Sequence, residues 1–189
     1  MSYTGPEKSG AKITIPDTID ADGVTLKVTG IAPNAFLKDK KLKTVTIGAN
    51  VETIGVSAFK GCAKLTTVKG GESVTEIESN AFNGCKALKK FPVMDGLETI
   101  GAGAFKGCVK LAKFTLGENV SDIGKNAFNG CKALKTITVK TEWLDSDSVG
   151  KAAFKGISKK ATFKCPKSML KAYKKLFVKK GAPKSCRFR

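Results

Sequence analysis

The residues best suited to chemistry in this sequence are six cysteines, because the chain contains no histidine. Four of the cysteines follow one another at intervals of 23 residues: Cys62, Cys85, Cys108 and Cys131. A zinc site needs four ligands that converge on one point, whereas this spacing places the thiols in single file along a repeat. We therefore expect four buried thiols that pack as small apolar side chains, and no metal site.

The other two cysteines, Cys165 and Cys186, stand outside this series and flank an expected C-terminal helix. In an extracellular protein such a pair is a candidate disulfide that would fix the tail. The alternative is two unrelated thiols, and the sequence leaves both interpretations open.

Groups suited to catalysis are missing. There is no histidine to act as a base, and no pair of carboxylates whose surroundings suggest a raised pKa. Glu142, Asp145 and Asp147 surround Trp143, but three carboxylates on one loop lack the spacing of a calcium loop. We predict a solvated loop with Trp143 packed on the core, and a chain that is not an enzyme and uses no cofactor.

The elements that position these residues follow from a repeat of about 23 residues. The dipeptide Ala-Phe occurs six times, with its aromatic residue at Phe36, Phe59, Phe82, Phe105, Phe128 and Phe154. Isoleucine or valine recurs five residues before each of these, and leucine six residues after the first five of them. A unit this short cannot bury its apolar face alone, so successive units must stack.

Each unit has room for one short strand. Segments 65–68, 88–93 and 134–139 alternate inward apolar residues with outward threonine or lysine, a pattern that predicts parallel strands. Stacked strands would present their outward residues as one continuous concave face: Thr44, Thr46, Thr67, Lys69, Lys90, Pro92, Lys113, Thr115, Thr136, Thr138 and Lys140. This face is the natural binding surface, although threonine also serves strand propensity and lysine solubility.

One repeat carries a specific resemblance. Residues 123–139, which read IGKNAFNGCKALKTITV, are similar to the BspA-like (bacterial surface antigen type) leucine-rich repeat. The resemblance covers about residues 31–165, with Asp39 and Ile157 in place of cysteine in the first and last units. It implies a right-handed, horseshoe-like solenoid. It also implies secreted or surface-attached bacterial proteins that act in adhesion and bind host or matrix ligands.

The two ends of the chain are expected to cap the solenoid, because stacked repeats expose apolar surface at each end. Residues 1–30 predict a β-type cap, with a strand at 12–16 and a hairpin whose turn is Asp22-Gly23. Residues 166–180 predict one helix whose apolar residues recur at helical spacing: Met169, Leu170, Tyr173, Leu176 and Phe177. The chain is then one domain over 1–189, with six repeats at 31–165 and a basic helical cap at 166–189.

Charge is the remaining clue. The chain has 32 lysines, two arginines and a net charge of +18, of which +14 falls in residues 150–189. The lysines of the cap helix form a candidate patch for polyanions: Lys171, Lys174, Lys175, Lys179 and Lys180. The scarcity of arginine argues against base-specific reading of nucleic acid. A merely solvated cap is the alternative.

The resemblance implies a non-enzymatic adhesion or ligand-binding module of a bacterial secreted protein that acts at the cell surface, and we expect a monomer. Its expected partner is a host or matrix protein or glycan, or an anionic cell-wall polymer. The alternatives are a passive spacer whose basic cap touches wall polymers, and a nonspecific nucleic-acid binder. The sequence has no apolar stretch of transmembrane length and no visible secretory signal.

Overall fold

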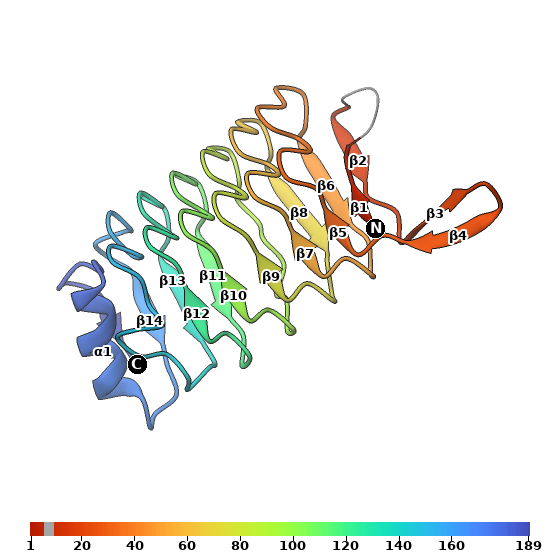
Figure 1. Ribbon diagram of the computed structural model, residues 1–189. Helices are drawn as coiled ribbons and strands as arrows, with labels where there is room; N and C mark the ends of the chain where they lie inside the picture. Colours follow the sequence, from red (N-terminus) through yellow and green to blue (C-terminus); the bar gives the residue numbers. More distant parts are fainter. Residues whose placement is uncertain (6–9) are drawn as a thin grey trace.

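The computed structural model describes residues 1–5 and 10–189, which wind into a parallel-stranded solenoid of about seven turns (Figure 1). We call each turn a rung. The leucine-rich-repeat solenoid predicted from the sequence is confirmed. The chain termini lie at opposite ends of the stack.

Most rungs contain two strands, so the prediction of a single strand per unit was incomplete. The longer strands form two sheets. The first consists of β2 (Lys12–Thr14), β6 (Thr44–Ile47) and β8 (Thr67–Gly70). The second consists of β11 (Lys113–Leu116), β13 (Thr136–Val139) and β14 (Thr162–Lys164), with the two-residue strand β15 (Arg187–Phe188) at its edge. Two-residue strands form a separate six-stranded sheet: β1 (Ser2–Tyr3), β5 (Gly30–Ile31), β7 (Thr53–Ile54), β9 (Glu76–Ile77), β10 (Thr99–Ile100) and β12 (Asp122–Ile123). The isoleucines that recur five residues before the phenylalanines of the repeat are the buried residues of this six-stranded sheet.

The longer strands do not form the continuous sheet that we predicted, because the strand expected at 88–93 is absent. Lys90 makes one isolated bridge to Thr67: its N–H donates to Thr66 and its carbonyl accepts from Val68, both at 3.3 Å. In this register the next donor would be the backbone nitrogen of Pro92, which has no hydrogen. The face is therefore divided into two sheets at the fourth rung.

The interior is built around a column of stacked phenylalanine rings. The six rings of the Ala-Phe dipeptides lie with successive centroids 4.9–5.6 Å apart and with interplanar angles of 3–7°. Tyr3 stacks on Phe36 at one end of the column, and Phe177 meets Phe154 edge-on at the other. Aromatic contact thus runs through every rung and into both caps.

Backbone hydrogen bonds explain why alanine and phenylalanine recur as a pair. The N–H of Phe59 donates to the carbonyl of Ala81 at 2.8 Å, and the N–H of Phe105 donates in the same way to Ala127 at 2.8 Å. Each dipeptide therefore accepts a bond from one rung and donates a bond to the next. The buried alanine leaves room for this close approach of the chains.

At the C-terminal end, helix α1 (Leu170–Lys179) covers the last rung, and it begins later than the predicted start at residue 166. Its buried side chains are Tyr173, Leu176 and Phe177, as predicted, whereas Met169 and Leu170 are half-buried at its start. The Tyr173 hydroxyl donates to the Thr141 carbonyl at 3.0 Å and accepts from the Leu144 N–H at 3.2 Å. Tyr173 thereby ties the helix to the loop that precedes the last repeat.

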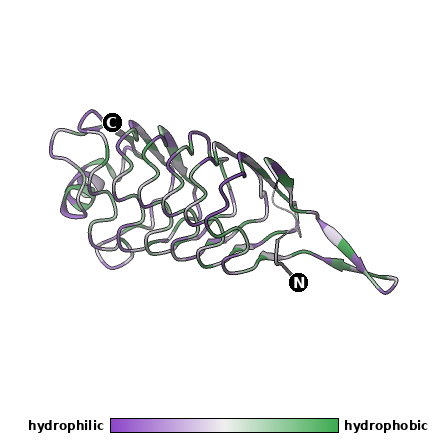
Figure 2. Ribbon diagram, turned by 90° about the horizontal axis from the view of Figure 1, so that it is seen from above, coloured by the Kyte–Doolittle hydropathy of each residue, from purple (hydrophilic) through white to green (hydrophobic). Residues whose placement is uncertain are grey.

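At the N-terminal end, β1 and β2 each add one strand to a sheet and so extend the stack. The predicted hairpin is confirmed as β3 (Thr18–Ala21) and β4 (Val24–Lys27), with positive φ at Asp22 and Gly23, as a two-residue type I′ turn requires. It projects away from the solenoid, however, as Figure 2 shows. The covering of this end falls to β1 and β2, and the hairpin beyond its base is not part of the cap.

The phenylalanine column predicts a large effect of a single deletion. Phe105→Ala should lower the free energy of unfolding by about 3–5 kcal/mol, because a fully buried ring between two stacked neighbours leaves a cavity. Denaturant unfolding followed by circular dichroism measures the change. The exposed neighbour Lys106→Ala is the control and should stay within about 0.5 kcal/mol of the parent. A loss below about 1 kcal/mol for Phe105→Ala would contradict the central place of the column.

Candidate binding surface

The structure places all eleven predicted residues of the long-strand face at the surface, and none of them is buried. It does not bring them together as one set. Six of them line a hollow of about 610 Å³ on the N-terminal sheet and the bridge beside it: Thr44, Thr46, Thr67, Lys69, Lys90 and Pro92. The other five lie on or just after β11 and β13, beyond the break at Pro92: Lys113, Thr115, Thr136, Thr138 and Lys140.

Sequence reasoning missed two residues of this hollow. Lys12 and Thr14 of β2 line it as well, because β2 pairs with β6 and places Thr14 beside Thr46. The strand at 12–16 was predicted, and its alternation already indicated which side chains point outward. Assigning it to the cap alone removed it from the face.

The chemistry of the hollow is that of a polar donor surface. Three lysine ammonium groups and four threonine hydroxyls surround apolar atoms of Ile13, Val68 and Phe91, and no carboxylate is among the lining residues. Hydroxyls both donate and accept hydrogen bonds, while ammonium groups only donate. The arrangement can hold a hydroxyl-rich or acidic ligand, and it contains no group that could act as a nucleophile with its base.

Two lysines of the predicted cap patch bond to the loop before the last repeat. The Lys180 ammonium donates to the Ser146 carbonyl at 2.6 Å, and the Lys179 ammonium donates to the Ser146 hydroxyl at 3.3 Å. These two side chains therefore hold the neighbouring loop. Lys171, Lys174 and Lys175 are exposed, and with Val178, Lys179 and Lys184 they line a shallow hollow of about 500 Å³.

The four cysteines of the column are buried, as predicted, and each makes a hydrogen bond that sequence reasoning missed. The Cys62 thiol donates to the Phe36 carbonyl at 2.9 Å, and the other three thiols reach the corresponding carbonyl of the preceding rung at 3.1–3.2 Å. Burial raises the pKa of the Cys62 and Cys131 thiols to about 12. These thiols therefore stay protonated near neutral pH.

The structure does not form the candidate disulfide between Cys165 and Cys186. The pairing of β14 with β15 sets Thr162 opposite Arg187, so Cys186 lies beside residue 161, while the Cys165 N–H donates to the Arg189 carbonyl. Four positions along a strand correspond to about 13 Å, and a disulfide requires Cα atoms within about 7 Å. Both residues are free thiols.

The loop before the last repeat departs from prediction in one respect. Trp143 is 74% exposed, whereas we expected it to pack on the core. Leu144 takes the buried position, and its N–H is held by Tyr173. The carboxylates do not converge: Asp145 accepts the N–H groups of Asp147 and Ser148, and Glu142 accepts the Ser168 hydroxyl. Among the described residues, no group of three or more ligands comes together as a metal site.

Comparison with known proteins decides the family. Residues 29–144 match the model of the BspA type leucine rich repeat region, in six copies. The chain belongs to the BspA-type leucine-rich repeat family. None of the curated proteins compared with it matches. Within residues 1–5 and 10–189, no helix has the length and apolar character needed to cross a membrane.

Solved structures share the fold of this BspA-type chain. A leucine-rich repeat protein from Bacteroides ovatus is 29% identical, with a TM-score of 0.74 over 87% of this chain and 43% of its own. The Treponema pallidum protein TpLRR is 25% identical, with a TM-score of 0.70 over 88% and 83%. The pneumococcal vaccine antigen PcpA is 21% identical, with a TM-score of 0.71 over 96% and 41%, and so shares the fold. The chain spans less than half of the Bacteroides ovatus protein.

The thiol geometry predicts how the protein reacts with an alkylating reagent. In the native protein at about pH 8, Cys62, Cys85, Cys108 and Cys131 should remain unmodified, because they are buried and their pKa values are raised. After unfolding in denaturant without reductant, mass spectrometry should count six labels. Labelling of the column in the native state, or only four labels after unfolding, would contradict this assignment.

Proposed function

We propose that this chain is a non-enzymatic ligand-binding module of a bacterial cell-surface or secreted protein. Repeats of the BspA type are commonly surface-associated, and leucine-rich repeats generally serve as protein-interaction modules. In adhesion, such a module would hold a host or matrix protein or glycan through its long-strand face. Catalysis has no support, because the surface groups found above include no activated nucleophile or base.

The observation that carries the proposal is the hollow on β2, β6 and β8. It gathers side chains from four successive rungs into one concave site of about 610 Å³, which is within the range of ligand sites. Binding residues contributed by consecutive repeats are the usual way in which a solenoid builds a recognition surface. The sheet of β11 and β13 carries threonine and lysine residues of the same kind.

The chemistry of the lining residues favours a polar partner. Thr44, Thr46 and Thr67 are half-buried, so their hydroxyls are held in place by the strands. Lys69 and Lys90 are exposed at the rim, where they can pair with a carboxylate or sulfate. An acidic glycan or an acidic segment of a protein fits this set better than an apolar ligand.

A second candidate function is attachment to an anionic cell-wall polymer through the cap, with the repeats as a spacer. The observation in its favour is the shallow hollow around Lys171, Lys174, Lys175 and Lys184. The two functions use opposite ends of the chain, so variants of one end separate them. Binding of nucleic acid ranks third, because a chain with only two arginines is poorly equipped for base-specific contacts and would be left with phosphate contacts alone.

The test places carboxylates in the hollow. The labelled chain is applied to panels of immobilised matrix proteins and acidic glycans, and the double variant Thr46→Asp/Thr67→Asp is compared with it. Binding should fall at least tenfold, because two carboxylates would face an acidic ligand and lose their own solvation in the contact.

The matched control is Thr115→Asp/Thr136→Asp, which makes the same change at the equivalent positions of β11 and β13. It should bind within about threefold of the parent. An equal loss of binding in both variants would show that the hollow is not the binding site. Failure of the parent chain to bind any member of the panels would contradict the adhesive function itself.

A further inference from the structure

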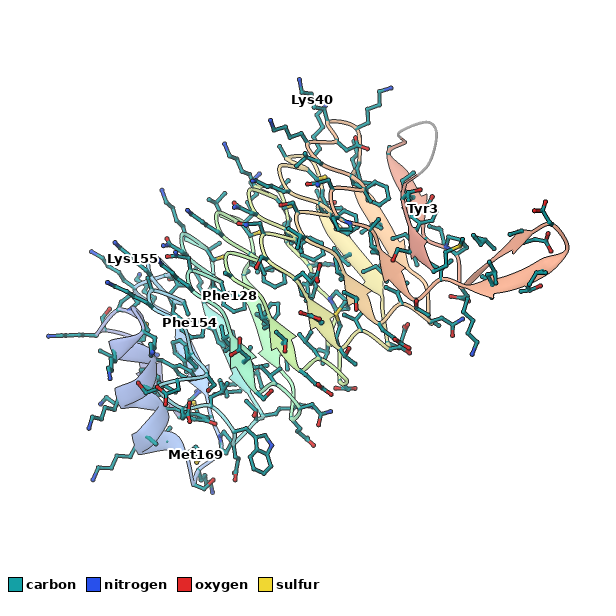
Figure 3. The ribbon with its side chains drawn as sticks, viewed as in Figure 1. Tyr3, Lys40, Phe128, Phe154, Lys155 and Met169 are labelled. Carbon is teal, nitrogen blue, oxygen red and sulfur yellow. The ribbon has the colours of Figure 1, made fainter. Side chains whose placement is uncertain are left out.

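The two long edges of the solenoid carry opposite charge, and neither proposed site uses this feature. We call the first the Ala-Phe edge. It consists of the irregular segments that lead from the short strand or bridge of each rung to the position of its longer strand: 32–43, 55–66, 78–89, 101–112, 124–135 and 150–161. The acidic edge consists of segments 48–54, 71–77, 94–100, 117–123 and 140–149, which include the turns after the longer strands and the short strands or bridge that follow them. In Figure 3, lysine nitrogens line the side that bears Lys40 and Lys155, and carboxylate oxygens gather along the opposite side.

The separation of charge is nearly complete. The Ala-Phe edge has 17 lysines and two carboxylates, and every one of these lysines is exposed: Lys38, Lys40, Lys41, Lys43, Lys60, Lys64, Lys86, Lys89, Lys106, Lys110, Lys125, Lys132, Lys135, Lys151, Lys155, Lys159 and Lys160. The acidic edge has ten carboxylates and one lysine, Lys140: Glu52, Glu72, Glu76, Asp95, Glu98, Glu118, Asp122, Glu142, Asp145 and Asp147.

The two carboxylates of the Ala-Phe edge bond to the backbone. Asp39 accepts the N–H groups of Lys41 and Leu42 at 2.7 and 3.0 Å. Glu78 accepts the N–H of Val56 at 2.7 Å. Both therefore shape loops of the edge, and the edge as a whole keeps a large excess of positive charge.

The stacking of the rungs gathers these lysines into one band of positive charge that runs along the solenoid. The edge carries 17 lysines in six rungs, or about three per rung, so rungs about 4.8 Å apart present roughly one lysine per 1.7 Å of the stack. Duplex DNA carries about the same linear density of negative charge. A line of like charges repels itself, and a flexible chain of opposite charge that lies along it relieves this repulsion and releases counterions.

We propose that the Ala-Phe edge binds a linear polyanion, a chain of phosphate or sulfate groups that lies lengthwise across the rungs. Lysine offers compact point charges without the planar fork of arginine, which suits a polymer recognised through its charge. The rings of the Phe column are buried between the rungs, so they offer no stacking surface to nucleic-acid bases. The inference concerns a different surface from the hollow and does not rest on the proposed function.

The test compares two triple variants with the same change in charge. Lys60→Gln/Lys106→Gln/Lys155→Gln removes the lysine that follows phenylalanine in three rungs of the edge. Lys171→Gln/Lys174→Gln/Lys175→Gln is the control, because it removes three exposed lysines from the cap helix. Binding of fluorescent inorganic polyphosphate is measured by anisotropy between 50 and 200 mM salt.

The edge variant should bind at least tenfold more weakly at 50 mM salt. The slope of log affinity against log salt should become shallower by about 2, since each phosphate contact on a single chain contributes about 0.7. The cap variant should stay within threefold of the parent. Lys60→Arg/Lys106→Arg/Lys155→Arg, which keeps the charge, should bind like the parent, and unfolding curves of every variant check that the fold is intact.

Chain length supplies a second readout that does not depend on any variant. Polyphosphate that spans all six rungs should bind far more tightly than a chain that spans fewer than three. Equal losses in the edge and cap variants, or affinity that does not depend on chain length, would overturn the proposal, because either result indicates attraction by net charge alone.

Further experiments distinguish the chemical source of the polyanion and test a rival occupant of the edge. Heparin fragments and duplex DNA of matched length, compared with polyphosphate, show whether sulfate, phosphate or a nucleic acid binds best; preference for duplex DNA would overturn the choice of a flexible chain. The rival is the acidic edge of a second copy. If a second copy occupied the edge, sedimentation of the protein alone at low salt would show self-association, and the variant Glu52→Gln/Glu72→Gln/Glu118→Gln would lose it. That result would also overturn the proposal.

Discussion

The constraint on which the structure depends is the close stacking of one rung on the next. A 23-residue unit gains stability when its neighbours cover it, so each rung must offer the same apolar groups at the same positions. The phenylalanine column and the hydrogen bonds from each phenylalanine N–H to the alanine of the next rung satisfy this requirement together. The buried thiols follow the same logic, since each donates to a phenylalanine carbonyl of the preceding rung. Both caps repeat it, with Tyr3 and Phe177 at the ends of the column.

Because stacking uses the apolar residues and the four column cysteines, function is left to the polar surfaces that stacking repeats. The long-strand face gathers threonine and lysine, and its N-terminal half is hollowed where Pro92 ends the sheet. The two edges collect charges of opposite sign. A net charge of +18 is therefore not spread evenly over the molecule. Any one rung contributes only a few polar or charged side chains to each surface. Because these side chains recur in successive rungs, together they form extended surfaces.

The sequence predicted the features that are periodic and missed those that depend on one residue. The columns indicated the solenoid and the core, because a repeated position must have a repeated environment. The helical spacing of apolar residues indicated the cap helix. The repeat period does not predict features that depend on local register. These are the sheet break at Pro92, the exposure of Trp143 and the separation of Cys165 from Cys186. The edges were missed for another reason: charge was counted along the chain, whereas the fold sorts it across each rung. Counting lysines by their position in the repeat would have shown them.

The most direct test of this account is a lysine footprint. The protein is acetylated briefly with and without polyphosphate, and mass spectrometry reports the extent of modification at each lysine. We expect protection along the Ala-Phe edge in all six rungs, from Lys40 to Lys155, and no protection of Lys27 on the projecting hairpin. Protection confined to the cap helix, or uniform over the surface, would contradict the claim that stacking assembles single lysines into one binding edge.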